Sequence, residues 1–218
     1  PPRPGKLAGA VANVRARIAA AAGRAGRDPA SVTLVAAAKT VSAPRVAEVL
    51  ALGVLDVGEN RAQELLAKAP ALAAEPSPPR WHFVGRLQRN KVSSVAPWVT
   101  LWQSVDREPL GVAIARRAPG ARVLVEVNLG AEAQKGGCEP SATPVLVDAL
   151  RDLGLDVGGL MTVHPQDGDA RRWFVALREL GDRLGLRELS MGMTDDFDVA
   201  VEEGATIVRV GRALFGAR

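Results

Sequence analysis

Tyrosine is absent from the 218-residue sequence, cysteine occurs once and histidine twice. The single cysteine, Cys138, excludes an internal disulfide framework and suits a reducing compartment. No apolar run is long enough to span a bilayer, and no signal-peptide pattern is visible. We therefore expect a cytoplasmic protein without a membrane partner. Because the chain opens on Pro1 and not on methionine, we also expect the natural N-terminus to lie upstream.

Motifs of several enzyme classes are missing as well. The sequence contains neither H-E-x-x-H nor paired Cys and His residues, so we expect no metal site. The G-x-S-x-G elbow and the G-x-x-x-x-G-K-[ST] loop are absent too. His82, between Trp81 and Phe83, is typical of a core histidine with its hydrogen bonds satisfied. The neighbouring acids Asp195 and Asp196 splay around a helix, which is typical of a solvated face.

The charge balance is basic, with a net charge of +4 and an isoelectric point of about 9.8. Such values invite a nucleic-acid interpretation. However, the arginines are dispersed along the chain, and aromatic residues make up only 4% of it. Non-specific nucleic-acid binders combine a basic groove with aromatic stacking platforms. We therefore expect no nucleic-acid partner.

What the sequence does contain is a regular alternation of strand-like and helix-like segments. Its composition, 47% hydrophobic and 24% charged, is that of a globular domain. Strand-like runs occupy residues 32–40, 55–60, 81–86, 101–106, 122–130, 156–164, 188–193 and 206–213. Helical patterns cover residues 42–53, 61–73, 142–154 and 170–185, after an Ala-rich helical lead-in over about 6–27.

This alternation predicts an α/β fold with a parallel sheet, because strands that alternate with helices form βαβ units. About eight such units favour a single (β/α)8 TIM barrel over residues 1–218, with an extra N-terminal helix. A doubly wound open sheet is the alternative, but no G-x-G-x-x-G follows the first strand. In a barrel, functional residues lie where strands end and loops begin.

Lys39 ends the first expected strand, in "LVAAAKT". Strand alternation places Lys39 on the same side as Val35 and Ala37. If this side faces the lumen, the small residues leave room above them for a ligand. A desolvated lysine is a nucleophilic amine suited to a Schiff base. A solvated lysine at the barrel rim is the alternative.

Two glycine-containing turns follow the seventh and eighth expected strands. Ser190, Gly192 and Thr194 lie in the first turn, "SMGMT", and Gly211 lies in the second, "RVGR". A turn that opens a helix offers free backbone N–H groups to a phosphate, and barrels often bind phosphate after these two strands. In the alternative interpretation, Thr194 is simply the N-cap of a helix.

Arg209 lies within a short β-branched strand, on the same face as Gly211. Because arginine is seldom buried alone, we expect it to bind an anion or a ring nitrogen, or else to pair with a carboxylate such as Glu126. Asn60 and Asn128 at strand ends are weaker signals. Together these residues suit a phosphorylated carbonyl compound, either pyridoxal 5'-phosphate (PLP) or a sugar phosphate in a Schiff-base aldolase.

Several segments together resemble the YggS-type pyridoxal phosphate homeostasis family, which is similar to the barrel domain of alanine racemase. The segments extend from the first strand to the C-terminus. They are "AAAKT", "GENRAQE", "WHFVGRLQRNK", "VNLGAEAQKGG", "GLMTVHP" and "LSMGMTDDFDVAVEEGATIVRVGRALFGAR". The resemblance implies an alanine racemase-like, PLP-binding TIM barrel.

The resemblance also assigns roles to particular residues. It implies the following cofactor site: Lys39 as the Schiff base, Asn60 and Met161 lining the cofactor, Arg209 facing the pyridine nitrogen, and Ser190, Gly192, Thr194 and Gly211 around the phosphate. Two positions depart from the family pattern. Thr194 replaces a usual Ser and keeps the hydroxyl, whereas Arg212 replaces a usual Thr or Ser and adds charge.

Carrier and enzyme are the competing functions. Alanine racemase uses a tyrosine from a second domain as its other acid/base, and this sequence has no tyrosine. An arginine at the pyridine nitrogen also weakens the cofactor as an electron sink. The resemblance therefore implies PLP binding and homeostasis without efficient catalysis, with PLP-dependent apoenzymes as recipients. A PLP-dependent racemase-like enzyme is the alternative, and a closed barrel favours a monomer because it has no free sheet edge.

Overall fold

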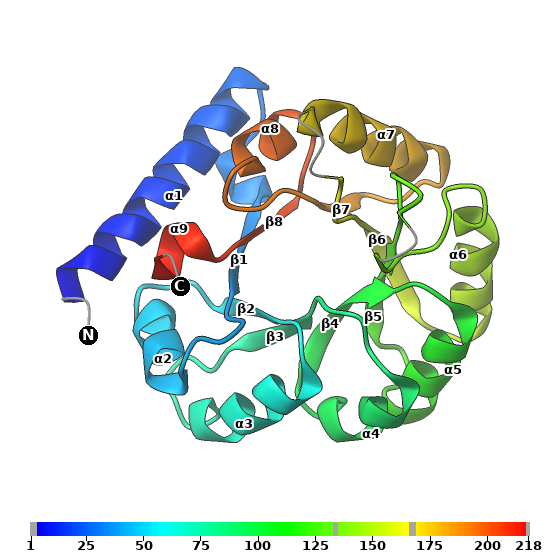
Figure 1. Cartoon of the computed structure of the whole chain (residues 1–218), viewed down its shortest axis with the longest axis horizontal. Coiled ribbons are helices and arrows are strands. Elements are labelled where there is room, and N and C mark those ends of the chain that lie inside the picture. The colour runs from blue at the N-terminus through cyan, green and yellow to red at the C-terminus, as the bar shows by residue number, and fades with distance from the viewer. Residues whose placement is uncertain (1–3, 133–134, 166–168, 217–218) are drawn as a thin grey trace.

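Eight parallel strands close into a ring in the computed structural model of the chain, which describes residues 4–132, 135–165 and 169–216 (Figure 1). Each strand pairs with the next in sequence, and β8 pairs with β1. The strands are β1 (Thr33–Ala37), β2 (Asp56–Glu59), β3 (Arg80–Phe83), β4 (Val99–Val105), β5 (Arg122–Glu126), β6 (Asp156–Met161), β7 (Glu188–Ser190) and β8 (Ile207–Val210). The predicted barrel is confirmed, and the open-sheet alternative is wrong.

Helices surround the ring of strands on its outer side (Figure 1). They are α1 (Pro4–Arg24), α2 (Ala43–Ala51), α3 (Ala62–Leu72), α4 (Val92–Val95), α5 (Glu108–Arg117), α6 (Thr143–Asp152), α7 (Ala170–Arg183), α8 (Phe197–Glu202) and α9 (Arg212–Phe215). Short 3-10 helices lie at η1 (Pro29–Ser31) and η2 (Arg89–Lys91). None of these described helices is both long and apolar enough to cross a membrane.

The extra N-terminal helix is α1, which overlaps most of the lead-in expected at about 6–27. Its buried residues recur every three or four positions, which places them on one face of the helix. They are Leu7, Val11, Val14, Ile18, Ala21 and Ala22. This face packs against α8 and α9, so the first helix of the chain covers the last part of the barrel (Figure 1).

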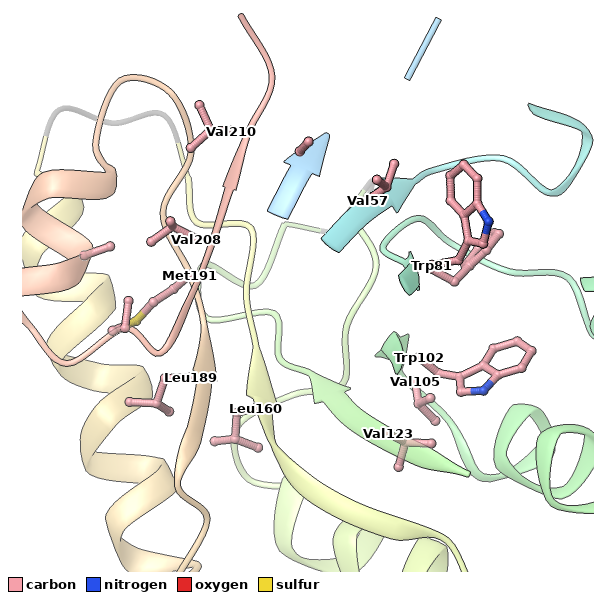
Figure 2. Packing of buried hydrophobic residues seen from close by; sticks show 14 of the residues in the cluster. Val57, Trp81, Trp102, Val105, Val123, Leu160, Leu189, Met191, Val208 and Val210 are labelled. Atoms are coloured by element: carbon pink, nitrogen blue, oxygen red, sulfur yellow. The ribbon is translucent and has the colours of Figure 1, made fainter. Parts of the chain in front are cut away.

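Strand alternation separates two hydrophobic cores. The larger one lies between the strands and the helices, where Figure 2 shows outward side chains such as Leu189, Met191 and Val208. The smaller one fills the inside of the barrel and consists of Val35, Leu101, Leu124, Met161 and Ile207. Side chains therefore fill the lumen, so we expect a ligand at the end of the barrel where the strands finish.

Candidate functional site

A pocket of about 540 Å³ opens at the end of the barrel where the strands finish. Five of the eight residues assigned to the site by the sequence line it: Lys39, Asn60, Thr194, Arg209 and Gly211. The other lining residues are Ala37, Lys135, Val163, His164, Met193, Asp195, Asp196 and Arg212. They come mainly from β1, β6, β7 and β8 and from the loops that follow them.

Lys39 follows β1 and is half-buried. The predicted alternation holds, because Val35 belongs to the lumen core, Ala36 belongs to the outer core, and Ala37 and Lys39 line the pocket. The chain then turns away, with the Val41 N–H donating to the Ala38 carbonyl at 2.9 Å. This turn presents the Lys39 side chain to the pocket.

Asn60 follows β2, where Gly85 of the next loop passes close over its backbone. A Cβ atom at Gly85 would lie only 2.2 Å from the Asn60 carbonyl oxygen. Only glycine permits this approach, because any side chain would overlap the Asn60 backbone. This close contact fixes the position of the Asn60 backbone at the pocket wall.

Arg209 is buried at the base of the pocket. Its Nη1 donates to the Ser190 hydroxyl at 2.6 Å and its Nη2 donates to the Thr162 carbonyl at 2.8 Å. Burial lowers the pKa of Arg209 to about 10, although the charges of Glu126 and Asp196 act in the opposite direction. The guanidinium therefore stays positive at neutral pH. Both of these hydrogen-bond acceptors are uncharged, which differs from the carboxylate pairing considered for Arg209.

Thr194 lies between the turns that follow β7 and β8. Its hydroxyl oxygen accepts a long hydrogen bond, 3.4 Å, from the N–H of Ala213 in α9. Helix α8 begins only at Phe197, with Asp196 as its N-cap residue. The alternative interpretation of Thr194 as a helix N-cap is therefore wrong. The preceding Gly192 has a φ of 89°, in the left-handed region that favours glycine.

Three residues assigned to the site by resemblance do not line the pocket. Met161 belongs to the lumen core and is fully buried. Ser190 is fully buried and donates to Gln103 Oε1 at 2.6 Å while it accepts from Arg209. Gly192 lies behind the turn, close to α8. Their assigned roles toward the cofactor stay predictions.

A chain of buried hydrogen bonds continues from Ser190 across the barrel. Gln103 Nε2 lies 2.7 Å from His82 Nδ1, and His82 Nε2 lies 3.1 Å from Asp56 Oδ1. His82 is thus a core histidine with both ring nitrogens bonded, as predicted. Burial disfavours the charged form of Asp56, but hydrogen bonds from Arg80 and His82 outweigh it and hold its pKa at about 2. This series of hydrogen bonds fixes Ser190, which in turn orients Arg209.

His164 and Asp196 form a site feature that the sequence did not identify. His164 Nε2 lies 2.9 Å from Asp196 Oδ2, and its Nδ1 lies 2.6 Å from the Pro165 carbonyl. The hydrogen bond to Asp196 raises the pKa of His164 above its usual value, against the effect of burial. The prediction of a solvated face is wrong for Asp196, which is turned inward by this pairing. The prediction of a solvated face fits Asp195, which pairs with Arg212 and is exposed.

Lys135 is the second lysine of the pocket. Its amine donates to the His164 carbonyl at 2.9 Å and pairs with Glu132 at 2.5 Å. Lys135 belongs to a family-like segment, "AEAQKGG", but nothing in the local pattern indicates that it reaches the pocket. Lys135 lies between β5 and α6 in sequence, and the tertiary structure brings it to the pocket.

Comparison with known proteins agrees with this fold. The family model described as the alanine racemase N-terminal domain matches residues 10–218. A pyridoxal phosphate homeostasis protein of Pseudomonas aeruginosa is 43% identical over 218 residues, which cover 95% of this chain and 94% of the relative. One from Aquifex aeolicus is also 43% identical, over 95% of this chain and 96% of the relative.

A solved structure adds a bound ligand to the comparison. PipY of Synechococcus elongatus, determined with PLP bound, is 31% identical to this chain and has a TM-score of 0.82. The match covers 96% of this chain and 100% of PipY. The resemblance inferred from the sequence motifs is confirmed. The chain belongs to the pyridoxal phosphate homeostasis proteins, a family built on the barrel of the alanine racemase N-terminal domain.

Proposed function

We propose that this protein binds PLP in the pocket at the end of the barrel and takes part in PLP homeostasis. One observation carries the proposal: the Lys39 amine and the buried Arg209 guanidinium line one pocket, beside the turns after β7 and β8. An amine suits the cofactor's aldehyde, and a cation with backbone N–H groups suits its phosphate and ring nitrogen. PipY, a relative at 31% identity, was solved with PLP bound.

Eight residues have proposed roles toward the cofactor; five of them line the pocket, whereas Met161, Ser190 and Gly192 do not. Lys39 would hold it as a Schiff base, Asn60 and Met161 would line it, Arg209 would face the pyridine nitrogen, and Ser190, Gly192, Thr194 and Gly211 would surround the phosphate. When bound, PLP supplies an electron sink to amino-acid chemistry. A cationic Arg209 opposes protonation of the ring nitrogen and so weakens that sink.

Binding and delivery are favoured over efficient catalysis by the surroundings of Lys39. A racemase needs acid/base groups on both faces of its substrate. The sequence has no tyrosine, and His164 commits both ring nitrogens to Asp196 and Pro165. A carrier of this kind would pass PLP to PLP-dependent apoenzymes in the cytoplasm and would act as a monomer.

The first test is the visible absorption spectrum of the protein mixed with PLP. We expect a Schiff-base band in the parent protein and its loss in Lys39→Ala. Lys135→Ala is the matched control, because Lys135 is the other lysine of the same pocket, and this variant should keep the band. No band in the parent would contradict the proposal, and a sugar phosphate would then be the ligand to test.

A second measurement separates carrier from enzyme. The PLP-loaded protein is incubated with alanine in deuterated water, and exchange of the α-proton is followed by NMR. We expect exchange no faster than with free PLP. Rapid exchange that depends on Lys39 would favour the racemase-like enzyme instead.

A further inference from the structure

A group of three charged residues, two of them buried, contacts the turn that carries Lys39. It consists of Glu59 at the end of β2 and Glu64 and Lys68 on α3. The Lys68 amine lies 2.5 Å from Glu59 Oε1 and 3.4 Å from Glu64 Oε2. Both glutamates belong to the "GENRAQE" motif, in which only Asn60 has a proposed role at the cofactor.

This charged group contacts the peptide units on both sides of Lys39. On one side, the Lys68 amine donates to the Ala38 carbonyl at 2.8 Å. On the other side, the Thr40 N–H donates to Glu64 Oε2 at 2.6 Å. The residues before and after Lys39 are therefore held by two side chains of one helix, and those side chains are linked to each other.

The turn needs such support because its backbone is strained. Thr40 has a φ of 61°, a left-handed conformation that is a genuine outlier for a β-branched residue. Strain of this kind persists only where the surrounding structure imposes it, and it concentrates at functional sites. The hydrogen bond from the Thr40 N–H to Glu64 acts on the strained residue itself.

Burial strengthens the interactions between the charges of Lys68 and the two glutamates. Lys68 is 7% exposed and Glu59 is fully buried. Burial raises the pKa of Glu59, and the ion pair with Lys68 opposes that effect. For Glu64, burial is outweighed by the Thr40 N–H and by Lys68, so its pKa lies below its usual value. A charged Glu64, the stronger acceptor for the Thr40 N–H, is thereby favoured.

We propose that Glu64 and Lys68 are positioning residues that hold the Ala38–Val41 turn so that the Lys39 amine faces the pocket. They touch no ligand and act through the Ala38 carbonyl and the Thr40 N–H. The inference rests on the proposed function only in naming what Lys39 reacts with. Because the reacting atoms must be placed within about 1 Å, a loosened turn slows the reaction of Lys39 even in a folded protein.

The experiment compares Glu64→Ala, Glu64→Gln and Lys68→Met with the parent protein. The Lys39 amine condenses with the aldehyde of added PLP with loss of water, and borohydride reduces the resulting C=N bond to a stable amine. Peptide mass spectrometry then gives the rate at which Lys39 is labelled. We expect labelling to slow by about 10- to 100-fold in Glu64→Ala and Lys68→Met. Glu64→Gln keeps an acceptor for Thr40 and should recover part of the rate.

A second readout needs no cofactor. Hydrogen exchange at the Thr40 amide in the cofactor-free protein reports the bond to Glu64, and we expect it to speed up by at least about 10-fold in Glu64→Ala. The control is Arg122→Met, which removes an ion pair with Glu188 at the opposite end of the strands. It should change neither Thr40 exchange nor Lys39 labelling. Glu64 is partly exposed, so the test survives if Lys68→Met fails to fold.

The outcomes separate the two proposals. If Lys39 of the parent is not labelled at all, the proposed function is wrong, and Thr40 exchange still tests the turn. If the parent is labelled, and Glu64→Ala matches the control in both labelling rate and Thr40 exchange, the positioning role is overturned.

Discussion

Two buried residues, Arg209 of the pocket and Glu126 of β5, influence each other's pKa. Glu126 Oε2 is buried and has no hydrogen-bond partner in the described part of the chain. Burial, reinforced by the charge of Asp106, raises the pKa of Glu126 to about 7, while Arg209 and Arg86 act against this. Near neutral pH, a proton on Glu126 therefore changes the net charge next to Arg209.

The raised pKa of Glu126 predicts a pH dependence of stability. Below about pH 4.5, its ordinary pKa, the carboxyl is protonated in both folded and unfolded chains. Between about pH 4.5 and 7 only the folded chain keeps the proton, so stability from this group is lost as the pH rises. The expected loss is on the order of 3 kcal/mol, since one pKa unit corresponds to about 1.4 kcal/mol.

The measurement is the free energy of unfolding in urea from pH 4.5 to 8, for the parent and for Glu126→Gln. A neutral glutamine cannot ionise, so the variant should lose this pH dependence and become the more stable protein at pH 8. Parallel pH profiles for the two proteins would show that Glu126 is not the group responsible.

At the scale of elements, the turns after the strands decide the shape of the pocket. Gly192 links β7 to the loop before α8, and a Cβ atom there would lie 2.5 Å from the Cβ of Ala200. Together with the φ of 89°, this contact leaves no room for a side chain. The turn that carries Thr194 therefore depends on a glycine for its conformation and for its packing on α8.

Gly192→Ala should consequently cost more than a glycine replacement at a similar φ in open space. We expect a loss of about 2–4 kcal/mol in the free energy of unfolding, from the left-handed backbone and the overlap with Ala200. Gly185→Ala is the matched control, because Gly185 has a φ of 65° and no atom within 4 Å of the added Cβ. It should lose only about 1–2 kcal/mol. Equal losses in urea denaturation would contradict the packing argument.

At the scale of the whole molecule, α1 joins the beginning of the chain to its end. Its apolar face packs on α8 and α9, and the Arg17 guanidinium lies 4.2 Å from the centre of the Phe197 ring. Arg17 also pairs with Asp198, and Arg24 pairs with Glu202. Since α8 and α9 follow the turns at the pocket, α1 supports the phosphate side of the proposed site from outside the barrel.

Removing one buried side chain from α1 tests this support. Ile18→Ala should lower the free energy of unfolding by about 2–5 kcal/mol, because Ile18 is 5% exposed and truncation leaves a cavity. Val145→Ala on α6 is the control, since Val145 is 73% exposed and should change stability by less than about 0.5 kcal/mol. Equal effects in urea denaturation would mean that α1 contributes little to the packed core.

Much of the fold and part of the site could be predicted from the sequence, because they follow from local periodicity. Alternation in "LVAAAKT" grouped Lys39 with Val35 and Ala37, and in "TIVRVG" it grouped Arg209 with Ile207 and Gly211. In the structure, Lys39 and Arg209 both line the pocket. The positions of Ser190 and Met161 outside the pocket lining could not be predicted in this way. Alternation gives the face of a strand, but the depth of a residue in the barrel depends on the register of all eight strands.

The sequence by itself thus determined the order of strands and helices, the residues that share a face in the first and last strands, and the lysine at the end of the first one. The tertiary structure decided which charges meet: His164 pairs with Asp196 across 32 positions, and Lys68 reaches the Ala38 carbonyl across 30. The physical reason is one of range. Secondary structure follows patterns within a few residues, whereas barrel closure brings distant groups within the few ångströms that hydrogen bonds require.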